Sequence, residues 1–221
     1  MKRIFLIGLL LLMATRGQAA EPAAGQGKGN SFTVSVPTAY MDDPRRGEWQ
    51  QPGKVLDYLL IRSGDVVADI GAGTGYFTLQ FAKRVGTGGV VYAVDVDPGM
   101  ISLIEQRAKK EGHGNVRGIL AALDDPGLPK GGADLIFICD TFLFFDNRGD
   151  YLLRLRDRLK PHGRVAIVSF NYKAEIPGAP PRHKMVSKEQ TVAEMEKAGF
   201  ALEADFLFLP YQDFLIFTKR S

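Results

Sequence analysis

Strand-like and helix-like segments alternate along most of this chain. Strands alternating with helices of about ten to fifteen residues imply right-handed crossovers and a parallel, doubly wound sheet. The near-continuous hydrophobicity of the later runs fits strands that are covered on both faces. The expected strands are 66–70, 90–94, 116–120, 133–139 and 164–170, and the expected helices are 52–61, 76–85, 98–110 and 150–159.

The end of the chain departs from this alternation. Ser187 and Gln190 form a capping-box pattern that predicts the start of a helix, and Gly199 is the residue where it should stop. Two strand-like runs follow, Phe200 to Leu209 and Asp213 to Lys219, and the three residues between them permit only a hairpin. We therefore predict an α/β fold, a three-layer, doubly wound Rossmann-like sheet of seven strands, mostly parallel with the last strand antiparallel.

The first twenty residues have the pattern of a secretory signal. Lys2 and Arg3 precede an apolar run from Ile4 to Met13, and small residues follow up to Ala20. We expect residues 1–20 to be cleaved after Ala19 or Ala20 and the protein to be exported or periplasmic. The run is shorter than the about 20 apolar residues that span a bilayer, although an uncleaved signal anchor stays open.

The rest of the chain divides simply. Residues 21–30 are rich in Ala, Gly and Gln and are expected to form a flexible linker. Residues 31–221 show no internal repeat and are expected to form one domain, with an N-terminal segment at 31–62 and a core at 63–221. Within the N-terminal segment, the aromatic and charged stretch Tyr40 to Trp49 is a candidate lid.

The charge and the cysteine content exclude some functions. The formal charge is +3, but losing Lys2, Arg3 and Arg16 with the signal would leave 25 of the 28 basic residues to balance 25 acidic ones. We therefore expect no nucleic-acid partner, and a membrane contact only through an uncleaved signal. Cys139 is the single cysteine, so no intramolecular disulfide can form.

A glycine-rich loop follows the first expected strand. Ligands of open α/β sheets bind outside the carboxyl ends of strands, which is where Gly71, Gly73 and Gly75 lie. A dinucleotide fingerprint would carry its last glycine where this chain has Tyr76, which argues against NAD and FAD. A nicotinamide-dependent oxidoreductase is also disfavoured because the chain lacks a Tyr-x-x-x-Lys pair.

The stretch VVADIGAGTGYFT resembles motif I of class I S-adenosylmethionine-dependent methyltransferases. The resemblance continues through VYAVDVDPGM, DLIFICD and LKPHGRVAIVSF, and so covers about Val66 to Phe170. It implies S-adenosylmethionine as the cofactor, with an acid near its ammonium, the loop at its amino-acid end, and a carboxylate on the ribose diol. The residues implied are Asp69 for the ammonium, Gly71, Gly73 and Gly75 for the amino-acid end, and Asp95 for the ribose, with Ala72, Tyr76 and Val96 as further cofactor-binding residues.

Some of these positions have simpler interpretations. The glycines could only form a tight turn, and Asp95 could only be an acid at a helix N-terminus, although Asp97 fits that role better. After the third strand, where many relatives carry Gly-Asp-Ala, Asp124 is either a contact of the adenine amine or a solvated loop acid.

Candidate catalytic residues follow the fourth and fifth strands. Asp140 would lie on the cofactor's side of the sheet as a cofactor-binding and catalytic residue, with the aromatic stretch Thr141 to Phe145 as a wall of the site or as core. Tyr172 is a second catalytic candidate. His183 could be a general base, or an exposed loop histidine.

The leading hypothesis is in-line methyl transfer to an unidentified small-molecule acceptor. The alternative is a non-catalytic protein that binds S-adenosylmethionine or its demethylated product, S-adenosylhomocysteine. Within the superfamily, WQQP before the core and HKM after the fifth strand resemble a group of exported, uncharacterised methyltransferases. Arsenite methylation would need several thiolates, DNA amino-methylation an Asn/Asp-Pro-Pro-aromatic motif, and catechol-type enzymes a second metal-binding carboxylate, so we predict no metal. The oligomeric state is left open.

Overall fold

The computed structural model describes residues 38–171 and 179–220. The predicted signal and linker, and Tyr172, lie outside the described residues. None of the described helices is long and apolar enough to cross a membrane.

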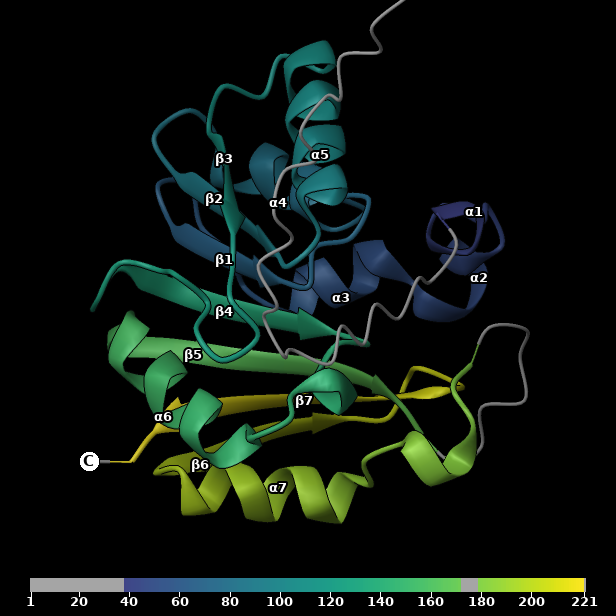
Figure 1. Ribbon diagram of the computed structural model, residues 1–221, viewed down its shortest axis with the longest axis vertical. Coiled ribbons are helices and arrows are strands. Elements are labelled where there is room, and N and C mark those ends of the chain that lie inside the picture. Colours follow the sequence, from purple (N-terminus) through teal and green to yellow (C-terminus); the bar gives the residue numbers. More distant parts are fainter. Residues whose placement is uncertain (1–37, 172–178, 221) are drawn as a thin grey trace, which may run out of the picture. The chain divides into compact units, whose positions relative to one another are not determined.

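A single seven-stranded sheet forms the centre of the domain, in the order β3-β2-β1-β4-β5-β7-β6 (Figure 1). The pairs among β1 to β5 are parallel, whereas β7 runs antiparallel to both β5 and β6. This confirms the predicted doubly wound sheet with an inserted antiparallel last strand. The strands are β1 Val66–Ile70, β2 Val90–Asp95, β3 Val116–Leu120, β4 Ala133–Cys139, β5 Leu159–Phe170, β6 Phe200–Phe206 and β7 Gln212–Lys219.

Helices cover both faces of the sheet. Successive strand residues point to opposite faces, so Val67 and Ala68 of β1 enter two different hydrophobic clusters. One cluster packs the sheet against α3, α4 and α5, and the other packs it against α6 and α7. The helices are α1 Thr38–Met41, α2 Arg46–Gln50, α3 Pro52–Tyr58, α4 Thr78–Val85, α5 Pro98–Lys110, α6 Arg148–Arg158 and α7 Lys188–Lys197, with short 3₁₀ turns η1 Phe142–Phe144 and η2 Arg182–Lys184.

Several boundaries differ from the prediction for local reasons. Helix α4 begins at Thr78 rather than Tyr76, because the turn that starts at the glycine loop continues through Phe77. Helix α6 begins at Arg148, two residues early, because the side chain of Asn147 caps it. Strand β6 ends at Phe206, before the buried Leu209.

The cap of α7 follows the prediction only in part. The side chain of Ser187 accepts a hydrogen bond from the backbone N–H of Gln190 at 3.1 Å, as a capping box requires. The side chain of Gln190 instead donates to Glu194 at 2.8 Å, so its amide is used along the helix. Gly199 has a positive φ of 85° directly after the helix, as a C-terminal glycine should.

Candidate functional site

The glycine loop turns sharply at the carboxyl end of β1. Gly71, Gly73 and Gly75 have φ values of 71°, 55° and 85°, a region that other residues rarely adopt. The backbone N–H groups of Gly71 and Ala72 both donate to the carbonyl of Val94, at 2.8 and 3.0 Å, which ties the loop to β2. The loop therefore forms a tight cradle of backbone at the end of β1, in which Gly71 and Gly73 are half-buried and Ala72, Thr74 and Gly75 are buried.

Asp95 ends β2 directly beside this cradle. One of its carboxylate oxygens accepts from the backbone N–H of Gly73 at 2.8 Å, and the other accepts from that of Asp97 at 3.0 Å. Since a carboxylate has about four lone-pair sites, acceptor capacity remains for hydroxyl groups. Asp97, not Asp95, caps α5, with its side chain accepting from Gly99 at 2.7 Å. The role of an acid at a helix N-terminus therefore belongs to Asp97, as expected.

Asp69 lies beneath the loop rather than at its surface. Its side chain is buried and accepts a hydrogen bond from the Thr78 hydroxyl at 2.6 Å, which joins β1 to the first turn of α4. Burial raises its pKa to about 6, although the Thr78 bond and the charge of Arg46 act in the opposite direction. Asp69 can therefore act on a ligand only through its charge and by holding the loop.

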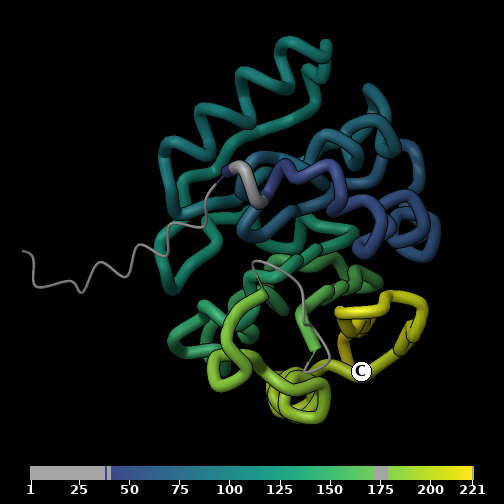
Figure 2. Tube along the Cα trace, turned by 90° about the vertical axis from the view of Figure 1, so that its right-hand side faces the viewer, coloured from purple at the N-terminus to yellow at the C-terminus, as the bar shows by residue number. Residues whose placement is uncertain are grey.

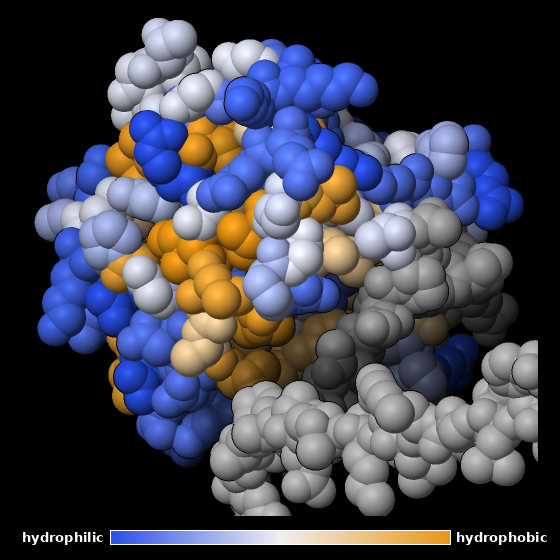
Figure 3. Space-filling model, turned by 45° about the horizontal axis from the view of Figure 1, so that its top comes forward, coloured by the Kyte–Doolittle hydropathy of each residue, from blue (hydrophilic) through white to orange (hydrophobic). Residues whose placement is uncertain are grey.

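Apolar side chains stand uncovered next to Asp95. Val96 is 51% exposed, and Leu120 and Leu123, at and after the end of β3, are 59% and 60% exposed. Figure 3 brings the β3 side of the domain forward and shows hydrophobic residues gathered there among hydrophilic ones. Asp124 points elsewhere, because its side chain is 77% exposed and faces Arg154 of α6 at 3.7 Å. That geometry favours the interpretation of Asp124 as a solvated loop acid over a contact of the adenine amine.

Asp140 follows β4 on the same edge of the sheet. Its backbone has a positive φ of 54°, and its half-buried carboxylate accepts from the Gln212 amide at 2.9 Å to each oxygen. Burial raises its pKa to about 6, although Arg46 and the amides of Gln212 and Gln50 act to lower it. Asp140 is thus a carboxylate poised to exchange a proton near neutral pH.

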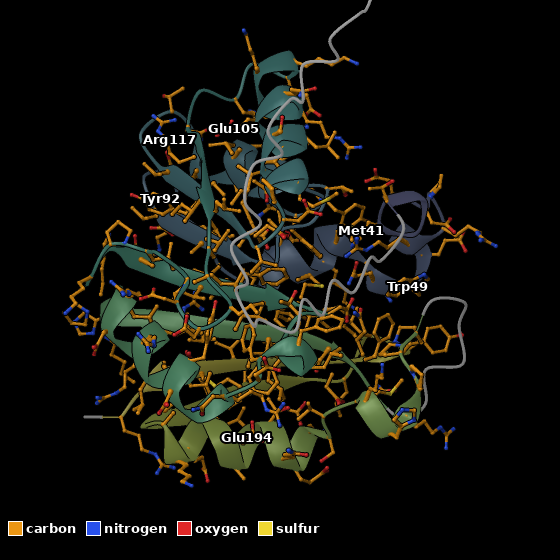
Figure 4. All side chains as sticks on the ribbon, viewed as in Figure 1. Met41, Trp49, Tyr92, Glu105, Arg117 and Glu194 are labelled. Atoms are coloured by element: carbon orange, nitrogen blue, oxygen red, sulfur yellow. The ribbon has the colours of Figure 1, made fainter. Side chains whose placement is uncertain are left out.

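The N-terminal segment, residues 38–50, packs on this edge (Figure 2, purple). Asp42 accepts from the hydroxyl of Thr74 in the glycine loop at 2.7 Å, and Arg107 of α5 pairs with Asp42 at 2.7 Å. Met41 lies so near the loop that a methyl group placed on Gly73 would come within 2.9 Å of its sulfur. Figure 4 labels Met41 and Trp49, near the two ends of this segment.

The far end of the segment reaches Asp140. Gln50 is fully buried, and its amide lies 3.0 Å from the sulfur of Cys139, 3.4 Å from Asp140 and 3.3 Å from the side-chain oxygen of Gln212. Trp49 packs against Phe170 at the end of β5, with ring centroids 5.7 Å apart. The segment thus connects the glycine loop with the ends of β4, β5 and β7.

The other predicted catalytic residues and the aromatic stretch after β4 have different surroundings. His183 is exposed in η2, and Tyr172 is not described. Phe142 and Phe145 are buried in the cluster shared with α6 and α7, while Phe144 is 41% exposed. The aromatic stretch is therefore mainly core. Of the three catalytic candidates, the described structure places Asp140 at the edge that carries the glycine loop, and its catalytic role stays a prediction.

Among the residues that the structure describes, no group of three His, Cys, Asp or Glu side chains could hold a metal. A concavity of about 550 Å³ lies at the opposite edge of the sheet, between the end of α4 and the start of β3, and Gly88, Gly112 and His113 contribute to its lining. It contains no acidic residue, and the carboxyl edge of a parallel sheet is where ligands bind.

Known proteins share this arrangement. A family model described as a methyltransferase domain matches residues 61–207, which is more than half of the chain. The chain belongs to this methyltransferase family. A solved structure of an S-adenosylmethionine-dependent methyltransferase from Aquifex aeolicus is 28% identical, with a TM-score of 0.77 over 81% of this chain and 95% of that one.

Curated methyltransferases match the chain over shorter stretches. Aklanonic acid methyltransferase DauC of Streptomyces sp. (strain C5) is 32% identical over 120 residues, 54% of each protein. The ubiquinone/menaquinone biosynthesis C-methyltransferase UbiE of Azotobacter vinelandii is 33% identical over 112 residues, 50% of this chain and 44% of its own length. This methyltransferase chain therefore spans about half the length of the curated relatives that it matches.

The cofactor of this methyltransferase domain is S-adenosylmethionine, and the site fits it. The cradle has no room for a side chain at Gly71, where an added Cβ would lie 2.8 Å from the Cβ of Thr141, so only backbone can meet a ligand there. Asp95 retains acceptor capacity for a ribose diol, and exposed Val96 and Leu123 offer apolar surface for a base.

Proposed function

We propose that this protein transfers a methyl group from S-adenosylmethionine to a small-molecule acceptor at the carboxyl edge of its sheet. The observation that carries the proposal is one continuous site. The glycine cradle, Asp95 and Asp140 come from three neighbouring strands, and the N-terminal segment contacts both Thr74 of the loop and Asp140.

Each part of the site has a physical role. Gly71, Gly73 and Gly75 let the backbone approach the amino-acid end of the cofactor, and Asp95 accepts from the ribose hydroxyls. Val96, Leu120 and Leu123 give the adenine apolar surface to cover. The N-terminal segment contacts the loop at Thr74 and β4 at Cys139, and so can shield from water the place where the acceptor must be aligned.

The bound cofactor supplies an electrophilic methyl group on a sulfonium. Asp140 takes the proton of an acceptor that arrives protonated, and its pKa of about 6 suits a base that works near neutral pH. The amide of Gln212 donates to both of its oxygens, and the amide of Gln50 lies 3.4 Å from one of them. The two amides therefore orient Asp140 toward the acceptor.

A small acceptor suits the site and the relatives. Both curated relatives are named for the biosynthesis of small organic molecules, aklanonic acid in one case and quinones in the other. The formal charge of the chain is close to neutral once the predicted signal is left out, so a polyanionic acceptor finds no complementary charge. We propose no metal in the reaction.

Calorimetric titration of the protein tests this proposal. S-adenosylmethionine and S-adenosylhomocysteine should each bind with micromolar affinity, and NADH, the control, should not bind. Asp95→Ala should weaken the binding of S-adenosylhomocysteine by about 10- to 100-fold, the loss expected for hydrogen bonds to a charged group.

A matched variant and a turnover assay complete the test. Asp97→Ala removes the cap of α5 but no proposed ligand contact, so it should lower stability and leave affinity within about threefold. Labelled S-adenosylmethionine with a panel of phenolic, enolic and carboxylic acceptors should then give a labelled product. Binding without transfer to any acceptor would favour a binding protein, and absence of binding would refute the cofactor site.

A further inference from the structure

Arg46 is a half-buried cation at the site without a carboxylate partner. Its Nε donates to the side-chain oxygen of Gln50, and one terminal nitrogen donates to the carbonyl of Met41 at 2.8 Å. The other terminal nitrogen has only the sulfur of Cys139, at 4.0 Å. Among the described residues, no carboxylate oxygen lies within 4.0 Å of its guanidinium.

The guanidinium of Arg46 has more N–H donors than its contacts use. A guanidinium carries five N–H groups in a planar fork that matches a carboxylate, and the contacts above use two of them well. The charge of Arg46 acts on Asp42, Asp69 and Asp140, but none of these carboxylates pairs with it within 4.0 Å. A partly buried guanidinium without a direct carboxylate contact is suited to an anionic ligand. The neighbouring Arg45 differs, because its guanidinium is exposed and pairs with Asp43 at 2.7 Å.

The position of Arg46 identifies the part of the ligand that it can reach. Its guanidinium carbon lies 4.2 Å from the centroid of the Tyr76 ring, and Tyr76 directly follows the last glycine of the cradle. Its charge also acts on Asp69 below the loop and on Asp140 at the end of β4. Arg46 therefore lies over the amino-acid end of the cofactor site, between the loop and the proposed base.

We propose that Arg46 binds the carboxylate of the amino-acid end of S-adenosylmethionine. This inference rests on the proposed function, because it places a further residue in the same cofactor site. The carboxylate is the anionic group of that cofactor, and the backbone of the glycine cradle is the surface proposed for the same end. The N-terminal segment then binds the cofactor directly through α2, besides covering it.

A pair of ligands isolates this contact. S-adenosylhomocysteine carries the amino-acid carboxylate, whereas 5′-methylthioadenosine keeps the adenosine and the sulfur but lacks that end. Arg46→Met should weaken binding of S-adenosylhomocysteine by about 10- to 100-fold in calorimetry and change that of 5′-methylthioadenosine less than about threefold. Arg46→Lys keeps a point charge and should recover part of the lost affinity.

Arg45→Met is the matched control, because it removes the same side chain from the adjacent, solvent-exposed position; it should change neither affinity by more than about twofold. Equal losses for both ligands in Arg46→Met would overturn the inference, since they indicate a displaced segment. Unchanged affinity for S-adenosylhomocysteine would overturn it too, and would leave the proposed function standing. A wild-type protein that binds neither ligand would refute the cofactor site itself.

Discussion

At the scale of single residues, the buried Asp69 and the half-buried Asp140 both have raised pKa values but have different neighbours. Asp69 has a hydroxyl donor, Thr78, and lies under the glycine loop. Asp140 has two amide donors and lies at the proposed acceptor side. Burial dominates in both cases, so each folded carboxyl group holds its proton to a higher pH than in the unfolded chain.

The raised pKa of Asp140 predicts how stability depends on pH. Because the folded pKa of about 6 exceeds the ordinary 3.8, the stability that Asp140 contributes is full below about pH 4 and is lost as pH rises through 6. Asp140→Asn removes this loss. Its stability relative to the wild type should therefore rise by up to about 3 kcal/mol from pH 4 to pH 7 in urea unfolding.

Asp124→Asn is the control for this measurement. Its side chain is mostly exposed, so its difference from the wild type should stay within about 0.5 kcal/mol at both pH values. If the free energies of unfolding of Asp140→Asn and the wild type changed equally with pH, Asp140 would not be desolvated as the structure indicates. The comparison uses the change with pH, so hydrogen bonds altered by the substitution at every pH cancel.

At the scale of elements, the N-terminal segment holds distant parts of the edge together. Asp42 binds both Thr74 and Arg107, while Gln50 contacts the ends of β4 and β7. The pair of Asp42 with Arg107 is about one-third exposed, and such pairs contribute about 1 kcal/mol or less to global stability. Its main effect is therefore expected in local opening of the segment.

Limited proteolysis measures that opening. Trypsin should cleave Asp42→Asn after Arg45 and Arg46 about two to five times faster than the wild type, with little change in the midpoint of thermal unfolding. Saturating S-adenosylhomocysteine should slow cleavage in both proteins. Asp57→Asn, which removes an exposed ion pair with Arg84, is the control and should leave the rate unchanged. Equal rates for all three proteins would mean that Asp42 does not hold the segment.

The elements also show what sequence reasoning can reach. The sequence predicts helix α5 and strands β1 and β4 with their observed bounds, because Asp97 and Pro98 mark a helix start and the strands are compact, mostly apolar runs. The glycine cradle and Asp95 were found for the same reason, since their signal lies within a short stretch.

The polar cluster around Asp140 could not be found that way. Gln50 and Gln212 are 162 residues apart and meet only after the sheet has formed. The stretch Tyr40 to Trp49 was marked as a candidate lid, but nothing local distinguished Arg46 from Arg45. The one available signal was the i, i+4 spacing of Arg46 and Gln50, which puts both on one face of a helix.

At the scale of the whole molecule, we propose that the methyltransferase acts after export. The proposal rests on the charged start, apolar run and small residues of positions 1–20, which precede the described domain. Cell fractionation should find the protein outside the cytoplasm, and N-terminal sequencing should begin at Ala20 or Glu21. A cytoplasmic protein that begins at Met1 would contradict export.

Strand β7 lies between β5 and β6 although it follows both along the chain. A ribosome releases β6 first, so the interior of the sheet keeps an open place until β7 emerges and brings Gln212 to Asp140. A nascent chain therefore cannot form the Gln212–Asp140 hydrogen bonds until β7 has been synthesised and inserted between β5 and β6.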